Sequence, residues 1–280
     1  MKPVEPLALQ GWDASLELGF DHDCGTTRLA RRRHAGPLVV QRPLYAEGSS
    51  VCQAIVVHPP GGIAGGDRLE VLGMLGVKAH AQLTTPGATK WYRSLGREAS
   101  QRVRLIVAGG AVCEWLPQEN IVFDGARACL RLDVELATAA AYCGWELTCL
   151  GRPASGEPFA SGTVSQCSRL SRAGRTLLRE RAVIDGQDCL REAAPVLQGN
   201  CAYGTLIAIG PALTQETLAR AREVVSPCTQ AGVTAMGDMI VARWVGRRIE
   251  EGRALFTSLW AILRPWYAQR VAVVPRIWST

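Results

Sequence analysis

The stretch RACLRLDVEL, from Arg127 to Leu136, has the clearest periodicity in the chain, because apolar and polar side chains alternate along it. The apolar set consists of Ala128, Leu130, Leu132, Val134 and Leu136. The other set consists of Arg127, Cys129, Arg131, Asp133 and Glu135. Successive side chains of a β-strand point to opposite faces of its sheet. The stretch is therefore predicted to be a half-buried antiparallel strand with its polar face exposed.

Shorter stretches on both sides of this one predict further strands. Their residues are 51–57, 67–71, 101–107, 145–150, 177–184 and 204–209. Glycine and proline separate them at short intervals, which is typical of a protein built from many short strands.

Helical periodicity is confined to the last third of the chain. Thr214 is placed to cap a helix that runs to Val225. A second helix is predicted over residues 252–263, and Pro265 is predicted to end it, because proline lacks the backbone N–H that a helix needs. Residues 271–280 are predicted to be extended.

Length and composition describe an ordinary globular protein. Hydrophobic residues make up 48% of the 280 residues and charged residues 20%. With no long linker and no clear internal repeat, we expect one β-rich domain over residues 1–280. No apolar run is long enough to span a membrane and the N-terminus does not resemble a signal peptide, so a cytoplasmic protein is expected. The ten cysteines contain no Cys-x-x-Cys pair, and most are expected to be buried thiols.

The net charge of +6 comes almost wholly from arginine, which is densest at residues 31–34 (RRRH). Nucleic-acid binding is one use for such a run, but no basic helix, zinc module or aromatic-interleaved motif accompanies it. A solvated face or a protein interface is the favoured interpretation, since the planar guanidinium is weakly hydrated.

Residues 58–67 (HPPGGIAGGD) join two predicted strands through a turn rich in glycine and proline. The motif consists of His58, Pro59, Pro60, Gly61, Gly62, Ile63, Ala64, Gly65, Gly66 and Asp67. A phosphate-binding loop would need a lysine and a Ser or Thr after the last glycine, or a helix, and an aspartate would repel phosphate. The motif is therefore predicted to be a corner built from glycines.

Strand parity places two carboxylates on apolar faces. Asp67 shares a face with Leu69 and Val71, and Glu180 shares one with Leu178 and Ile184. A buried carboxylate is costly unless it is paired or hydrated. Each therefore pairs with a buried arginine, caps loop amides, or lines a polar passage where a divalent metal ion binds transiently and loosely. Arginine candidates for such pairing are Arg93 and Arg152.

The sequence gives little indication of an enzyme active site. The four histidines, at positions 22, 34, 58 and 80, lie in none of the familiar catalytic motifs. No catalytic residue, dedicated metal site or tightly bound cofactor is therefore predicted. Two alternatives stay open: a β-rich hydrolase with a spatially assembled His/Asp/Glu site, and an arginine-rich nucleic-acid binder.

Several motifs together resemble the urease accessory protein family UreD, also called UreH. They are the sequences at residues 36–38 (GPL), 41–45 (QRPLY), 58–67, 84–94 (TTPGATKWYRS), 115–119 (WLPQE), 121–125 (IVFDG), 151–157 (GRPASGE) and 275–278 (PRIW). They occur in the same order as in the family.

The resemblance implies a mainly β protein, with stacked sheets resembling a β-helix and two helices in its C-terminal part. It also implies a non-enzymatic factor for nickel-dependent urease. Such a factor binds apo-urease and the accessory protein UreF, through which the nickel-carrying GTPase UreG is recruited. Neither nucleic acid nor membrane is an expected partner. An internal path for nickel is proposed for the family, and the resemblance suggests Asp67 and Glu180 as residues along it.

Overall fold

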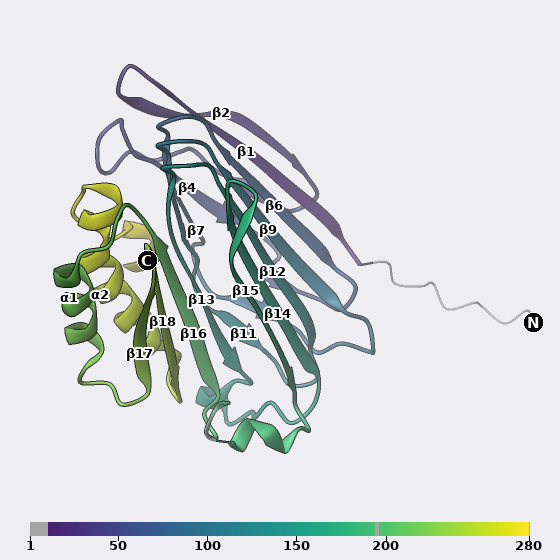
Figure 1. Ribbon diagram of the computed structural model, residues 1–280. Helices are drawn as coiled ribbons and strands as arrows, with labels where there is room; N and C mark the ends of the chain where they lie inside the picture. Colours follow the sequence, from purple (N-terminus) through teal and green to yellow (C-terminus); the bar gives the residue numbers. More distant parts are fainter. Residues whose placement is uncertain (1–10, 194–195, 280) are drawn as a thin grey trace, which may run out of the picture.

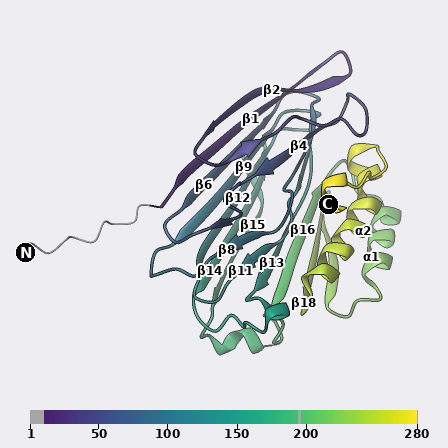
Figure 2. The ribbon, with the colours of Figure 1, turned by 180° about the vertical axis from the view of Figure 1, so that it is seen from behind.

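The computed structural model describes residues 11–193 and 196–279 as two stacked β-sheets, with two helices on the outer face of one sheet (Figures 1 and 2). The expected mainly β architecture, resembling a β-helix with two C-terminal helices, is confirmed. Among the described residues, no helix combines the length and the apolar character needed to cross a membrane.

The first sheet has seven strands. In spatial order they are β15 (Arg175–Asp185), β14 (Thr163–Arg172), β12 (Arg127–Leu136), β9 (Ala99–Val107), β6 (Arg68–Leu75), β1 (Asp13–Asp23) and β2 (Thr26–Ala35). Its central strands are parallel, and only the outermost pairs, β14 with β15 and β1 with β2, are antiparallel.

The second sheet has eleven strands. Its main path runs through β17 (Ala231–Met236), β18 (Met239–Gly246), β16 (Ala202–Ile209), β13 (Ala141–Leu150), β10 (Val112–Leu116), β7 (His80–Thr84), β4 (Cys52–Val57) and β3 (Val39–Val40). The short strands β5 (Gly62–Ile63), β8 (Thr89–Trp91) and β11 (Asn120–Val122) form a side strip that joins β13.

The chain winds between the two sheets in stacked coils. Val71 of β6 is paired with Val103 of β9, and Val103 with Leu132 of β12, so successive coils are 32 and 29 residues long. Each coil contributes one strand to the first sheet and at least one to the second, because β8 and β11 of the side strip follow β7 and β10 on their coils. Unequal coil lengths explain why no clear repeat is visible in the sequence.

The predicted strands are all present, but one prediction about their pairing is wrong. Arg127–Leu136 forms β12 with the expected alternation of buried and exposed residues, yet it pairs parallel with both β9 and β14. Parallel sheets usually have both faces covered by crossover helices. Here the crossovers pass through the second sheet, so the outer face of β12 stays in water and keeps its polar residues.

The observed helices agree in part with those predicted from the sequence. Helix α1 (Gln215–Val225) begins where predicted, and the Thr214 hydroxyl accepts a hydrogen bond from the Thr217 amide at 3.1 Å. Helix α2 (Ile249–Ala268) is longer than predicted and continues through Pro265. The prediction that Pro265 ends the helix is wrong, because the last turn is anchored by the buried side chain of Tyr267.

The C-terminal tail follows α2. Residues 271–275 have no regular structure, whereas Arg276–Ser279 form a short 3-10 helix in place of the expected extended chain. The Trp278 indole donates a hydrogen bond to the Thr84 hydroxyl at 2.8 Å, which fixes this turn against the second sheet. Thr280 lies outside the described residues.

Two apolar cores hold these layers together. The larger lies between the sheets and includes Phe20, Leu83 and Leu105. The smaller lies between the second sheet and the helices and includes Phe256 and Trp260. All ten cysteines carry free thiols, and five of them are buried, fewer than the majority expected.

Candidate functional site

The motif at residues 58–67 forms a tight corner that includes β5. Gly66 adopts a left-handed backbone conformation with φ of 101°, and the Arg97 guanidinium lies where a Cβ atom would be. The Tyr92 ring packs equally closely on Gly62. The predicted glycine corner is therefore confirmed, and its glycines allow the next coil to approach the backbone.

Asp67 stabilises this corner. Its side chain is buried, with Oδ1 accepting a hydrogen bond from the Trp12 amide and Oδ2 one from the Ala64 amide, both at 2.8 Å. Of the alternatives drawn from the sequence, amide capping is therefore the one that the geometry shows. Arg93, the suggested partner, instead pairs with Asp124 at 2.7 Å.

Glu180 lies on the inward face of β15, as strand parity predicts. It is half-buried and forms an ion pair with Arg243 of β18, which reaches across from the second sheet. Arg152, the other suggested arginine, pairs with Glu157. The structure therefore does not bring Glu180 and Asp67 together.

Glu180 lines a cavity of about 340 Å³ between the last strands of the two sheets, here called the Glu180 cavity. Glu146 of β13 lies in its wall and accepts hydrogen bonds from Gln166 at 2.7 Å and from Ser168 at 3.2 Å. Burial raises the pKa of the Glu146 carboxyl above its ordinary value, although the two hydrogen bonds oppose that rise.

A second cavity of about 320 Å³, here called the His58 cavity, also has Glu146 in its wall. Its other polar side chains include Lys90, Gln101 and Asn120. Both ring nitrogens of His58 are buried without a hydrogen-bond partner. Burial lowers the pKa of His58 below its ordinary value, against the opposing charge of Asp67, so the imidazole is neutral at pH 7.

Together the two cavities place a carboxylate, a neutral imidazole and amide oxygens inside the sandwich. Asp67 is not among the residues that line either cavity. Within residues 11–193 and 196–279, no group of three or more His, Cys, Asp or Glu side chains is arranged to hold a metal ion. Single oxygen and nitrogen ligands of this kind contact a divalent cation only weakly.

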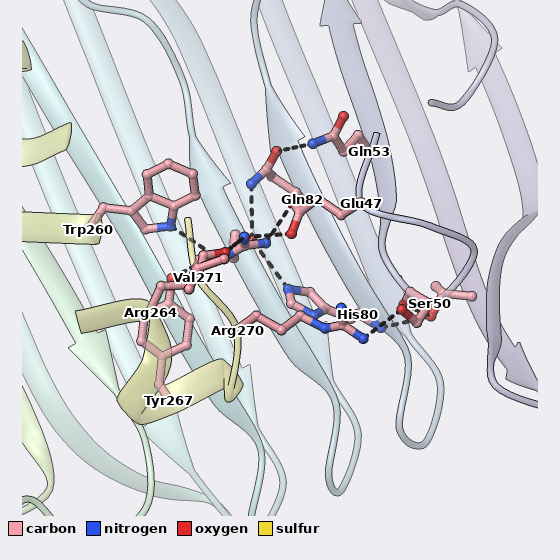
Figure 3. Close-up of polar contacts among 12 residues, drawn as sticks. Glu47, Ser50, Gln53, His80, Gln82, Trp260, Arg264, Tyr267, Arg270 and Val271 are labelled. Carbon is pink, nitrogen blue, oxygen red and sulfur yellow. Dashed lines mark hydrogen bonds and ion pairs between the residues drawn. The ribbon is translucent and has the colours of Figure 1, made fainter. Parts of the chain in front are cut away.

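A second polar cluster, missed by the sequence analysis, lies beneath α2 (Figure 3). At its centre Glu114 of β10 is fully buried. Its carboxylate accepts hydrogen bonds from the Trp260 indole at 2.8 Å and from the Tyr267 hydroxyl at 2.6 Å. His80 Nε2 and Gln82 Nε2 lie 3.2 and 3.1 Å from the other oxygen.

Arg264 of α2 joins this carboxylate to the loop before β4. Its Nε lies 2.9 Å from Glu114 Oε1, and its two terminal nitrogens lie 2.6 and 2.9 Å from the Glu47 carboxylate. Burial would raise the pKa of Glu114, but His80 and Arg264 overcome it and hold that pKa well below its ordinary value. The available signals were a lone carboxylate in the apolar run 111–116 and an arginine directly after the apolar run 259–263.

Comparison with known proteins agrees with this architecture. Residues 13–279 match the model of the UreD urease accessory protein family. A urease accessory protein UreD of Azoarcus sp. is 46% identical over 273 residues, which cover 98% of this chain and 96% of that protein. One from Dechloromonas aromatica is 45% identical over 280 residues, covering 99% and 97%. One from Pseudomonas fluorescens is 46% identical over 269 residues, covering 96% and 95%.

Fold and interior thus define a β-solenoid-like protein with polar cavities between its sheets and a helical layer outside. The family within this class follows from the match over nearly the whole chain. The chain belongs to the UreD family of urease accessory proteins.

Proposed function

We propose that this protein is a non-catalytic maturation factor of urease, acting in the cytoplasm as a scaffold. In this role it binds apo-urease and the accessory protein UreF, and through UreF it recruits the GTPase UreG. The support is similarity along nearly the full length to relatives named urease accessory protein UreD.

The hydrolase alternative finds little support in the geometry. In the part of the chain that the structure describes, the candidate acid–base pair is His80 with Glu114, at 3.2 Å. Both side chains are buried, and the Glu114 carboxylate already accepts hydrogen bonds from Trp260, Tyr267 and Arg264. A substrate would have no access to this pair.

The proposal extends to nickel as cargo, which passes through the interior of the sandwich. The single observation that carries this step is that Glu146 lies in the wall of both cavities. In the proposed path, Glu146 is therefore the ligand between Glu180 in one cavity and His58 in the other. Arg243 beside Glu180 weakens the attraction of that end for a cation. Weak binding suits transfer, because a tightly held ion would not leave.

Asp67 takes a different part in this proposal from the one suggested by the sequence. Its two oxygens are engaged by the amides of Trp12 and Ala64. It therefore shapes the corner that carries His58 and adds negative charge near the imidazole. Nickel contacts His58, Glu146 and Glu180 rather than Asp67.

Affinity capture tests the scaffold role. The tagged chain is purified from cells that express a complete urease system, and the captured subunits are identified. We expect urease and accessory subunits in stable proportion. Capture of the tagged chain alone, under conditions where those cells make active urease, would contradict the scaffold.

A further inference from the structure

Two segments far apart in the sequence expose apolar side chains at one end of the molecule. They are Leu44 and Tyr45 in the loop before β4, and Val271, Val273 and Val274 in the tail after α2, here called the docking strip. Their exposed fractions lie between 37% and 74%. Large apolar side chains gathered at a surface mark interaction sites more often than chance exposure does.

Hydrogen bonds tie the two segments together. One terminal nitrogen of Arg264 donates to the Val271 carbonyl at 2.7 Å and also to Glu47 at 2.6 Å. Arg270 donates to the Ser50 hydroxyl at 2.6 Å. Both ribbon views place the loop beside the yellow segment that follows α2, and Figure 3 shows these bonds in close-up.

The buried cluster under α2 is costly if its only purpose is stability. Removing the charges of Arg264, Glu47 and Glu114 from water carries a large desolvation penalty, which pairing only offsets. What the arrangement does achieve is specific: one guanidinium fixes the loop, the sheet and the tail in a single geometry.

Arginines surround the loop half of the docking strip. Arg32 of β2 donates to the carbonyls of Val40 and Gln41, and Arg42 is exposed beside Leu44. Burial raises the pKa of the Tyr45 hydroxyl, and the nearby charge of Arg28 opposes that rise. Arg28, Arg32 and Arg42 are all exposed.

We propose that the docking strip and its arginine rim bind an acidic amphipathic helix of a partner protein. The apolar face of such a helix covers Val271, Val274 and Tyr45, and its carboxylates meet Arg28 and Arg42. This inference rests on the proposed scaffold role and names the chemistry of one partner.

The test uses the full chain and two labelled peptides of roughly five helical turns. One carries leucine at helical spacing with glutamate on its flanks, and the other has glutamine in place of every glutamate. Fluorescence anisotropy should show binding of the acidic peptide that weakens between about 0.05 and 0.3 M salt. Equal affinity for the two peptides, or binding of neither, would overturn the inference.

Variants locate the binding surface. The double variants Val271→Asp/Val274→Asp and Arg28→Glu/Arg42→Glu should each weaken acidic-peptide binding about tenfold or more. Val183→Asp is the matched control, because the exposed fraction of Val183 lies between those of Val274 and Val271 but Val183 is on β15. An equal loss with Val183→Asp, or no loss with either double variant, rejects the docking strip. Thermal unfolding curves identify any variant that is misfolded, and Val271→Ser/Val274→Ser then replaces it.

Capture from cells separates this inference from the scaffold proposal. We expect Val271→Asp/Val274→Asp to lose one subunit that the wild-type chain captures, while Val183→Asp keeps it. If the wild-type chain captures subunits and the double variant captures all of them equally, the docking strip fails and the scaffold stands. If the wild-type chain captures nothing, the scaffold fails, and the peptide measurement still decides the strip.

Discussion

At the scale of single residues, the contact between the second sheet and α2 is built around a buried carboxylate as well as apolar side chains. Glu114 is surrounded by donors from two elements, α2 and β7. Those of α2 are the indole of Trp260, the hydroxyl of Tyr267 and the guanidinium of Arg264. Together these donors occupy both carboxylate oxygens. The charge is tolerated in the core only because every one of these donors is present.

Substitution of Glu114 measures this dependence. Glu114→Gln should lower the free energy of unfolding by about 3–5 kcal/mol. The substitution removes the negative charge that pairs with the buried Arg264, and it places an amide NH2 group among hydrogen-bond donors. Urea denaturation provides the measurement. Glu135→Gln, on the exposed outer face of β12, should change the same quantity by less than about 0.5 kcal/mol. Equal effects would show that Glu114 is not the centre of the cluster.

Acidification tests the same residue independently. The pKa of Glu114 is lower in the folded chain than its ordinary value, so its ionised form stabilises the fold above the unfolded pKa. This contribution is lost as the pH falls through the folded pKa. The difference in unfolding free energy between wild type and Glu114→Gln should therefore be constant near pH 7 and shrink below about pH 4. A difference that grows on acidification would contradict the assigned direction.

Asp67 has a local role that can be measured by hydrogen exchange. Asp67→Ala removes the acceptor of two backbone amides, those of Trp12 and Ala64, and should cost about 1–3 kcal/mol. Exchange at both amides should become faster, while amides within β12 keep their protection. Unchanged exchange at both would show that neither amide depends on the carboxylate.

The direction of a site residue's side chain could be predicted only where the alternation of faces along its own strand determines it. Parity correctly placed Asp67 and Glu180 on inward faces, because side-chain direction along a strand depends on neighbouring residues alone. Their partners could not be predicted, since Arg243 is 63 positions from Glu180, and Arg264 is 150 positions from Glu114. Glu146 belongs to a predicted strand, but only the stacking of the sheets shows that it borders two cavities.

At the scale of elements, the sequence determines type better than pairing. The alternation of polar and apolar residues in Arg127–Leu136 requires one solvent-exposed and one buried face, and β12 has both. Whether its neighbours are parallel depends on the path of the chain between strands, which in this fold runs through a second sheet. Similarly, the local backbone predicts that Pro265 ends the helix, whereas the buried side chain of Tyr267 holds the last turn of α2 in place.

The cap of α1 offers a test at this scale. Thr214→Ala removes the hydroxyl that accepts from the Thr217 amide and should lower the unfolding free energy by about 1 kcal/mol. Thr214→Ser keeps an equivalent acceptor and should lose only a fraction of that amount. Equal losses in chemical denaturation would assign the effect to the methyl group instead of the cap.

At the scale of the whole molecule, the cavities, the Glu114 cluster and the docking strip lie in different parts of the fold. The cavities lie between the sheets, the Glu114 cluster lies between the second sheet and α2, and the docking strip lies where the loop before β4 meets the tail. Because the cavities are separate from the strip, we expect that the proposed partner binding and the proposed cation passage can be altered independently.

The nickel content of urease matured by variants of this chain tests the central claim most directly. The double variant Glu146→Gln/Glu180→Gln should capture urease and accessory subunits as the wild type does. Urease recovered from those cells should contain about tenfold less nickel, because the ligands along the path are weakened. Glu135→Gln should leave the nickel content unchanged. Urease with full nickel content in the double variant would contradict passage of nickel through the interior.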